Sequence, residues 1–254
     1  MQPGPALSSL SVIIPAYNAA PFIAATLADV HDWLARRVGA FELIVVDDGS
    51  VDETAAAVRR FGRDVQLMQT VPNRGKGHAV RTGMLASACD WALFMDADNS
   101  TRIAELDAIA PRLADADVWI ASRRMQNSRI VRRQQPVRQA LGRAFPYFVR
   151  RLVLPGISDS QCGFKLFSRA AVRAIFPHQQ LERFAFDVEL LALARRAGLR
   201  IAEFPIDWDN PTDSSLRIGR DAARMLADLF GLWWRMYGGG RGPGGGGGAA
   251  GRGE

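Results

Sequence analysis

The sequence predicts an α/β fold in which helices flank a mostly parallel, Rossmann-like sheet. Short apolar runs alternate with amphipathic segments along the chain, which is typical of parallel strands joined by helices. Two of these runs end on a pair of carboxylates, and the ligand sites of open α/β sheets lie just outside the carboxyl ends of the strands. With 254 residues, of which 48% are hydrophobic, the chain can bury the core of one large domain.

The first half of the chain contains four expected strands and three expected helices. The strands are expected where short apolar, β-rich runs occur, at residues 10–15, 41–46, 65–69 and 91–95. The helices are expected at about 21–37, 51–61 and 78–88. Pro21 favours the start of the first helix, and Ser50 or Asp52 is the expected cap of the second.

The second half is expected to add strands at 117–121 and 200–205 and helices at 104–114, 168–175, 182–198 and 217–237. Ser168 is the expected cap of one helix, and Gly198 is typical of a helix end. The predicted domain covers residues 10–237 and follows a flexible segment, 1–9. Residues 238–254 contain 11 glycines and too few apolar groups to fold, so we expect them to be disordered.

Two acids follow the apolar run at residues 91–95. Asp96 and Asp98 are separated by one residue, so the end of a buried strand would present both carboxylates to a cleft. Their oxygens suit a hard divalent cation that also binds a diphosphate. The alternative is an Asp-rich turn or helix cap, because Asp favours those positions as well.

A glycine loop, Gly75–Lys76–Gly77, precedes the helix expected at 78–88. Val80 stands where a dinucleotide-binding fingerprint requires a third glycine, and no glycine lies five residues before Lys76, as a P-loop requires. Two interpretations are left. The loop contacts a phosphate or nucleotide at a helix N-terminus, or it is a plain turn.

The net charge of +6 predicts an anionic partner, and nucleic acid, anionic lipid and nucleotide phosphates all fit. No recognition motif accompanies the arginines, which argues against nucleic acid. Arginines gather at 127–155 among apolar residues at helical spacing, and Trp233 and Trp234 lie near the end of the segment 217–237. We expect both segments to be membrane-surface helices, with a solvated helix face or core packing as the alternatives.

The cysteine and histidine patterns argue against a zinc site and for a reducing compartment. Cys89 and Cys162 match no metal spacing, and the three histidines form no closely spaced pair. The first residues lack the pattern of a signal peptide, and no apolar run is long enough to span a bilayer. We therefore expect a cytoplasmic protein that is peripheral to a membrane.

Six motifs in order resemble the family 2 glycosyltransferases of the GT-A fold. The resemblance spans about residues 10–237 and is strongest to the branch that contains dolichyl-phosphate β-glucosyltransferases and dolichyl-phosphate mannose synthases. The matching segments are 11–18, 45–50, 73–77, 96–98, 163–167 and 183–190. The segments 159–167 and 182–191 favour the glucosyltransferase branch.

The resemblance implies inverting transfer of a single hexose from a nucleotide sugar to a polyprenyl phosphate. UDP-glucose is the preferred donor, and GDP-mannose is the alternative. The cofactor would be Mg²⁺ or Mn²⁺, bound by Asp98. The implied substrate-binding residues are Pro15, Tyr17 and Asp48 for the nucleobase and ribose, Asp96 for the nucleoside, Lys76 in the glycine loop, Arg123 and Lys165 for the diphosphate, and Arg217 in a closing loop.

Asp187 and Asp159 are the candidate catalytic residues. Either would act as a general base if the acceptor were a hydroxyl group. A polyprenyl phosphate is already largely ionised, because the second pKa of a phosphate monoester is about 6, and it needs no strong base. Asp187 then orients or supports the site, or it simply caps a helix.

Two departures from the family pattern leave other interpretations open. Ala19 and Ala20 stand where acids commonly follow Tyr-Asn, so a contact near the metal or nucleotide is absent. The Gln-x-x-Arg-Trp pattern of processive synthases is also absent, which argues against polymer synthesis. The remaining alternatives are a transferase with a soluble or protein acceptor and a noncatalytic module that binds nucleotide sugars or membranes.

Overall fold

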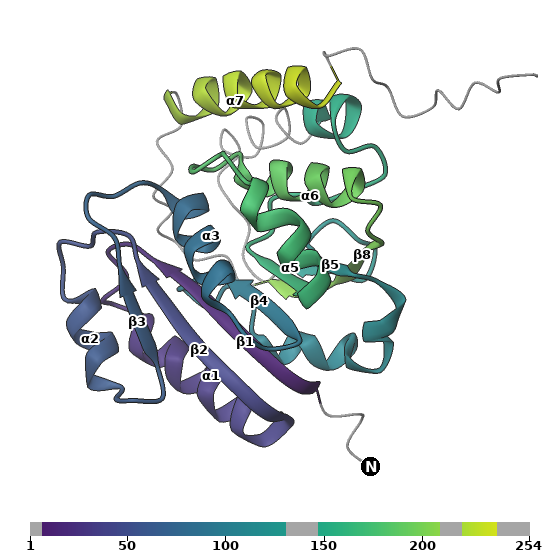
Figure 1. Ribbon diagram of the computed structural model, residues 1–254. Coiled ribbons are helices and arrows are strands. Elements are labelled where there is room, and N and C mark those ends of the chain that lie inside the picture. Colours follow the sequence, from purple (N-terminus) through teal and green to yellow (C-terminus); the bar gives the residue numbers. More distant parts are fainter. Residues whose placement is uncertain (1–6, 131–146, 209–219, 238–254) are drawn as a thin grey trace, which may run out of the picture.

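The computed structural model describes residues 7–130, 147–208 and 220–237 (Figure 1). Its main sheet has seven strands in the order β3-β2-β1-β4-β7-β5-β8. These strands are β1 (Leu7–Ala16), β2 (Val38–Asp47), β3 (Gln66–Gln69), β4 (Trp91–Met95), β5 (Val118–Ser122), β7 (Phe164–Ser168) and β8 (Ile201–Pro205). The expected fold class is confirmed, and β1 begins early enough to include residues 7–9, which were expected to be flexible.

Helices cover both faces of the sheet, as expected for a doubly wound fold. The helices α1 (Ile23–Arg37) and α2 (Thr54–Arg60) pack on one face, and α3 (Lys76–Ala86), α5 (Arg169–Ile175) and α6 (Phe186–Arg196) pack on the other (Figure 1). The last helix, α7 (Arg220–Tyr237), lies against α6 on the second face. Each face therefore has its own hydrophobic core. No helix of the described residues is long and apolar enough to cross a membrane.

One strand of the sheet runs against the others. β7 lies between β4 and β5 and is antiparallel to both, whereas the other pairs in the sheet are parallel. Because of this direction, the start of β7 lies beside the end of β4, with Phe164 opposite Met95. Residues just before β7 thus reach the edge of the sheet where the parallel strands end.

Two local expectations differ from the structure. Residues 104–114 form two 3₁₀ helices, Ile103–Ala108 and Ala110–Asp115, because Pro111 cannot continue an α-helix through this stretch. The cap of α2 is Glu53 and not Ser50 or Asp52. Ser50 Oγ accepts the N–H of Asn18, whereas the Asp52 carboxylate accepts the N–H of Thr54, the first residue of α2.

The arginine-rich segment is only partly helical. A short strand β6 (Arg129–Ile130) pairs with β9 (Asp207–Trp208), and helical residues follow at 147–152. Residues 131–146 of the segment lie outside the described residues, as do Arg217 and the glycine-rich tail. Ser168 does cap α5, because its side chain accepts the N–H of Ala171 at 3.2 Å.

Gly83 sets how closely α3 approaches the sheet, and its replacement tests this packing. An added Cβ would lie 2.5 Å from Cγ2 of Ile13 and 3.1 Å from Cγ2 of Val46. We expect Gly83→Ala to lower the free energy of unfolding by about 1–3 kcal/mol through overpacking.

Gly231→Ala in α7 is the matched control. No atom lies within 4 Å of its added Cβ, so better helix propensity should raise the free energy of unfolding by up to about 1 kcal/mol. Urea denaturation measures both, and equal stabilisation by the two variants would contradict the packing.

Candidate functional site

Asp48 shapes the glycine loop from the end of β2. Its buried carboxylate accepts the backbone N–H groups of Arg74 at 3.0 Å and Gly75 at 2.6 Å. The Asp48 carbonyl accepts the Asn73 side-chain amide at 2.9 Å. Burial raises the pKa of Asp48, although the two amide hydrogen bonds oppose the increase. Both carboxylate oxygens are thus engaged by the loop.

Glycine is required in this loop because other backbone lies against it. Gly75 has φ +118°, and a Cβ there would lie 2.5 Å from the Glu182 carbonyl oxygen. A Cβ on Gly77 would lie 2.7 Å from the Leu181 carbonyl oxygen. The loop is therefore held between Asp48 and residues 181–182, and its contact with a phosphate or nucleotide stays a prediction.

Lys76, the first residue of α3, forms an ion pair with Asp96 at the end of β4. Burial lowers the pKa of Lys76, but the negative charges of Asp96, Asp187 and Asp98 outweigh it and raise that pKa above its usual value. The Asp96 side chain lies directly against Gly163, where an added Cβ would collide with the carboxylate. The Asp96 carboxylate thus lies between the Lys76 ammonium group and the backbone of Gly163.

Asp98 is placed differently from Asp96. Its Oδ1 accepts the Ser100 N–H at 3.0 Å and the Ser100 hydroxyl, and among the described residues its other carboxylate oxygen has no hydrogen bond. The described chain contains no group of three acids, histidines or cysteines that could hold a metal. Mg²⁺ commonly uses one or two carboxylates together with substrate phosphates and water, so Asp98 and Asp96 fit a cation that arrives with a diphosphate.

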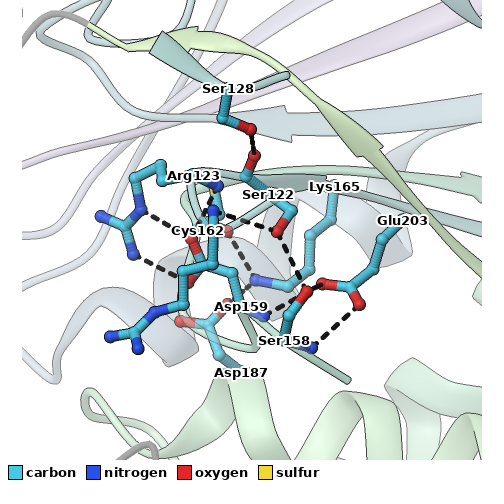
Figure 2. A network of polar contacts seen from close by, with 10 residues as sticks. Ser122, Arg123, Ser128, Ser158, Asp159, Cys162, Lys165, Asp187 and Glu203 are labelled. Atoms are coloured by element: carbon cyan, nitrogen blue, oxygen red, sulfur yellow. Dashed lines mark hydrogen bonds and ion pairs between the residues drawn. The ribbon is translucent and has the colours of Figure 1, made fainter. Parts of the chain in front are cut away.

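Lys165 and Asp187 form a buried ion pair at the centre of the network in Figure 2. The Lys165 ammonium is fully buried and also donates to the Cys162 carbonyl at 2.6 Å. Burial raises the pKa of Asp187, and the Coulomb attraction of Lys165 and Lys76 opposes this. Asp187 lies in the first turn of α6, but no described side chain caps that helix, so the capping interpretation is wrong.

Arg123 and Asp159 form a second ion pair, with two parallel hydrogen bonds (Figure 2). Arg123 Nε and Nη2 lie 2.7 and 2.9 Å from the two carboxylate oxygens, and the guanidinium lies over the Trp208 ring. Although burial raises the pKa of Asp159, the hydrogen bonds and charge of Arg123 lower it overall. A low pKa makes Asp159 a weak general base.

Glu203 on β8 holds the loop that carries Asp159, and sequence analysis missed it. Its carboxylate accepts the N–H groups of Ser158 and Asp159 at 2.9 and 3.0 Å, and also the Ser158 hydroxyl at 2.7 Å. Figure 2 shows Ser158 lying between Glu203 and Ser122. No sequence signal could have found this contact, because 44 residues separate Glu203 from Asp159.

The remaining predicted site residues lie near the same edge of the sheet or outside the described chain. Pro15 is in β1, paired with Val46, and Tyr17 follows the strand with half of its surface exposed. Among the described residues Tyr17 has no hydrogen-bond partner, so its ring is available to a ligand. Arg217 lies outside the described residues.

Solved structures show which fold the chain has. A glucosyl-3-phosphoglycerate synthase from Mycobacterium tuberculosis, in complex with Mn²⁺, UDP-glucose and phosphoglyceric acid, superimposes with a TM-score of 0.68. It is 18% identical, and the match covers 91% of this chain and 80% of that one. Mannosyl-3-phosphoglycerate synthase from Rubrobacter xylanophilus gives 0.68 at 18% identity, with 90% and 73% coverage. The fold is that of the GT-A glycosyltransferases.

Sequence comparison places the chain within that class. Dolichyl-phosphate β-glucosyltransferase from Dictyostelium discoideum is 34% identical, over 88% of this chain and 76% of that protein. The enzymes of the same name from Saccharomyces cerevisiae and Homo sapiens are each 33% identical, over 87% and 88% of this chain and 72% and 77% of their own lengths. The model of glycosyl transferase family 2 matches residues 11–176, and the chain belongs to this family.

The buried Lys165–Asp187 pair gives a pH-dependent prediction. In the folded state the pKa of Asp187 is raised above its usual 3.8, so this group stabilises the folded state fully below pH 3.8. That stabilisation is lost as the pH rises through the folded pKa. Lys165→Met removes the opposing ammonium and enlarges this loss. We expect it to lower the free energy of unfolding by about 3–5 kcal/mol near pH 8 and by much less near pH 4.

Urea denaturation of wild type and Lys165→Met at the two pH values measures this difference. The double variant Lys165→Met/Asp187→Asn is the control, because it leaves no unpaired buried charge and should recover part of the stability near pH 8. An equal loss of stability at both pH values would contradict a charged Asp187.

Proposed function

We propose that this protein transfers glucose from UDP-glucose to a polyprenyl phosphate, with inversion at the anomeric carbon. The relatives named dolichyl-phosphate β-glucosyltransferase support this choice of sugar and acceptor. The observation that carries the proposal is the arrangement of Asp98, Lys76 and Arg123 near one edge of the sheet, where a diphosphate would meet both a cation site and positive side chains.

In this proposal the donor lies across the carboxyl ends of β1, β2 and β4. Pro15 and Tyr17 contact the nucleoside beside the loop that Asp48 holds. Asp98, with Asp96 beside it, holds Mg²⁺ or Mn²⁺, which would stabilise negative charge on the leaving diphosphate. Manganese in the M. tuberculosis structure supports a divalent metal in this fold.

The cationic side chains have distinct roles. Lys76 and Arg123 are partly exposed, with 27% of each side chain accessible, so both can approach the diphosphate. Lys165 is fully buried, so it acts through Asp187, which it keeps charged and fixed in position. Because the acceptor phosphate is already ionised, Asp187 orients the acceptor side of the site without removing a proton.

Exposed apolar side chains support contact with a lipid surface. On α7, Leu226, Phe230 and Trp234 are exposed, whereas Trp233 packs against the core. In the helical residues 147–152, the exposed apolar side chains are Tyr147, Phe148 and Leu152, and Arg150 and Arg151 are exposed beside them. Aromatic and basic residues together favour an anionic lipid surface, so we place the acceptor there. The cytoplasmic location stays a prediction.

A donor panel tests the proposed reaction. UDP- and GDP-sugars are incubated with the protein, Mn²⁺ or Mg²⁺ and a polyprenyl phosphate in detergent, and the lipid extract is analysed for a glycolipid. We expect metal-dependent product from UDP-glucose. Product from GDP-mannose alone would favour the mannosyltransferase, and nucleotide binding with no glycolipid from any donor would contradict the lipid acceptor.

Asp98→Asn links the activity to the site. We expect it to reduce glycolipid formation by about 100-fold or more, because the cation loses its carboxylate ligand. Asp107→Asn is the matched control, since Asp107 pairs with Arg37 on the surface and should leave the rate unchanged. Circular dichroism checks that both variants fold.

The lipid surface gives a separate prediction. We expect the double variant Phe230→Ser/Trp234→Ser to bind anionic vesicles at least about tenfold more weakly than wild type, because two large apolar side chains no longer enter the interface. Leu85→Ser is the control, since Leu85 is an exposed apolar residue on α3. Vesicle co-sedimentation measures binding, and unchanged binding of the double variant would exclude α7 as the contact.

A further inference from the structure

The loop at residues 179–183, just before α6, packs against the glycine loop and forms hydrogen bonds with it. The His78 N–H donates to the Glu182 carbonyl at 3.1 Å, and the Gln179 side-chain amide donates to the Gly77 carbonyl at 2.8 Å. Arg74 also forms an ion pair with Glu182. Because one of these contacts joins backbone to backbone and another ends on the Gly77 carbonyl, a shift of the supporting loop would move the glycine loop as well.

Glu189 on α6 fixes that supporting loop. The residue is 1% exposed, and its carboxylate accepts the N–H groups of Gln180 at 2.9 Å and Leu181 at 2.6 Å through Oε2. The other oxygen, Oε1, accepts from Arg235 Nη2 at 2.9 Å. Arg235 also donates to the Gln180 side chain. A buried carboxylate that loses its cation is strongly destabilised, so the loop depends on the position of Arg235.

Arg235 belongs to α7, the same helix that exposes Phe230 and Trp234. We propose that Glu189 and Arg235 are positioning residues that link the lipid-facing helix α7 to the glycine loop of the donor site. The inference rests on the proposed function, in which the glycine loop borders the donor and α7 contacts lipid. Docking of α7 on a membrane then favours the arrangement that binds the nucleotide, and by linkage nucleotide binding favours docking.

Calorimetric titration with UDP and Mn²⁺ tests the link. We expect Arg235→Ala to weaken UDP binding by about 3- to 30-fold, and Arg235→Lys to recover part of the loss because it keeps the charge. Arg195→Ala is the matched control. Arg195 is an arginine of α6 whose side chain donates to the Pro155 carbonyl, so its loss should leave UDP affinity unchanged.

The same titration with vesicles of phosphatidylcholine and phosphatidylserine tests the coupling to lipid. We expect the vesicles to increase the UDP affinity of wild type and to leave that of Arg235→Ala nearly unchanged. Hydrogen exchange adds a structural measure, since the amides of Gln180 and Leu181 should exchange faster in Arg235→Ala.

The possible failures are distinguishable. Wild type that binds no UDP overturns the proposed function and this inference with it. If wild type and Arg235→Ala bind UDP with the same affinity, the inference is overturned and the proposed function is not. An equal effect of vesicles on wild type and Arg235→Ala also overturns it, because the link would then not pass through Arg235.

Discussion

The site depends on pairing buried carboxylates with cations from other parts of the fold. Asp187 pairs with Lys165 of β7, Asp159 with Arg123 after β5, and Glu189 with Arg235 of α7. Each of these three acidic residues is at most 5% exposed, so an absent partner would leave a charge without water or a counter-ion. The pairs therefore connect β7 with α6, the residues after β5 with the loop before β7, and α6 with α7.

Acids that look alike in the sequence differ in what remains available to a ligand. The pair at the end of β2 is engaged within the chain. Asp47 accepts the Ser50 N–H and the Gln69 side-chain amide, and Asp48 accepts two amides of the glycine loop. Contact of Asp48 with the nucleobase or ribose stays a prediction. After β4, Asp96 is held by Lys76, whereas Asp98 keeps one oxygen without a partner among the described residues. That difference makes Asp98 the acid best placed to ligate a metal.

Much of the fold could be predicted from local patterns, because apolar runs and helical periodicity are properties of neighbouring residues. Strand β7 (Phe164–Ser168) was not predicted, and neither was its antiparallel direction, because such a short run contains no signal for its pairing partner. Asp187 and Lys165 were both predicted to be site residues, but their pairing across 22 positions depends on packing. Glu203 and Glu189 were missed because they bind backbone N–H groups of distant loops, a role that any sequence position can hold.

The central claim is that a metal-bound diphosphate lies at the carboxyl ends of the strands. Its most direct test is a crystal structure with UDP and Mn²⁺. Anomalous scattering locates manganese without reference to the protein coordinates. The account predicts a peak between the Asp98 carboxylate and the diphosphate, with Lys165 still bonded to Asp187. Bound UDP with manganese away from Asp98, or a diphosphate at another edge of the sheet, would contradict it.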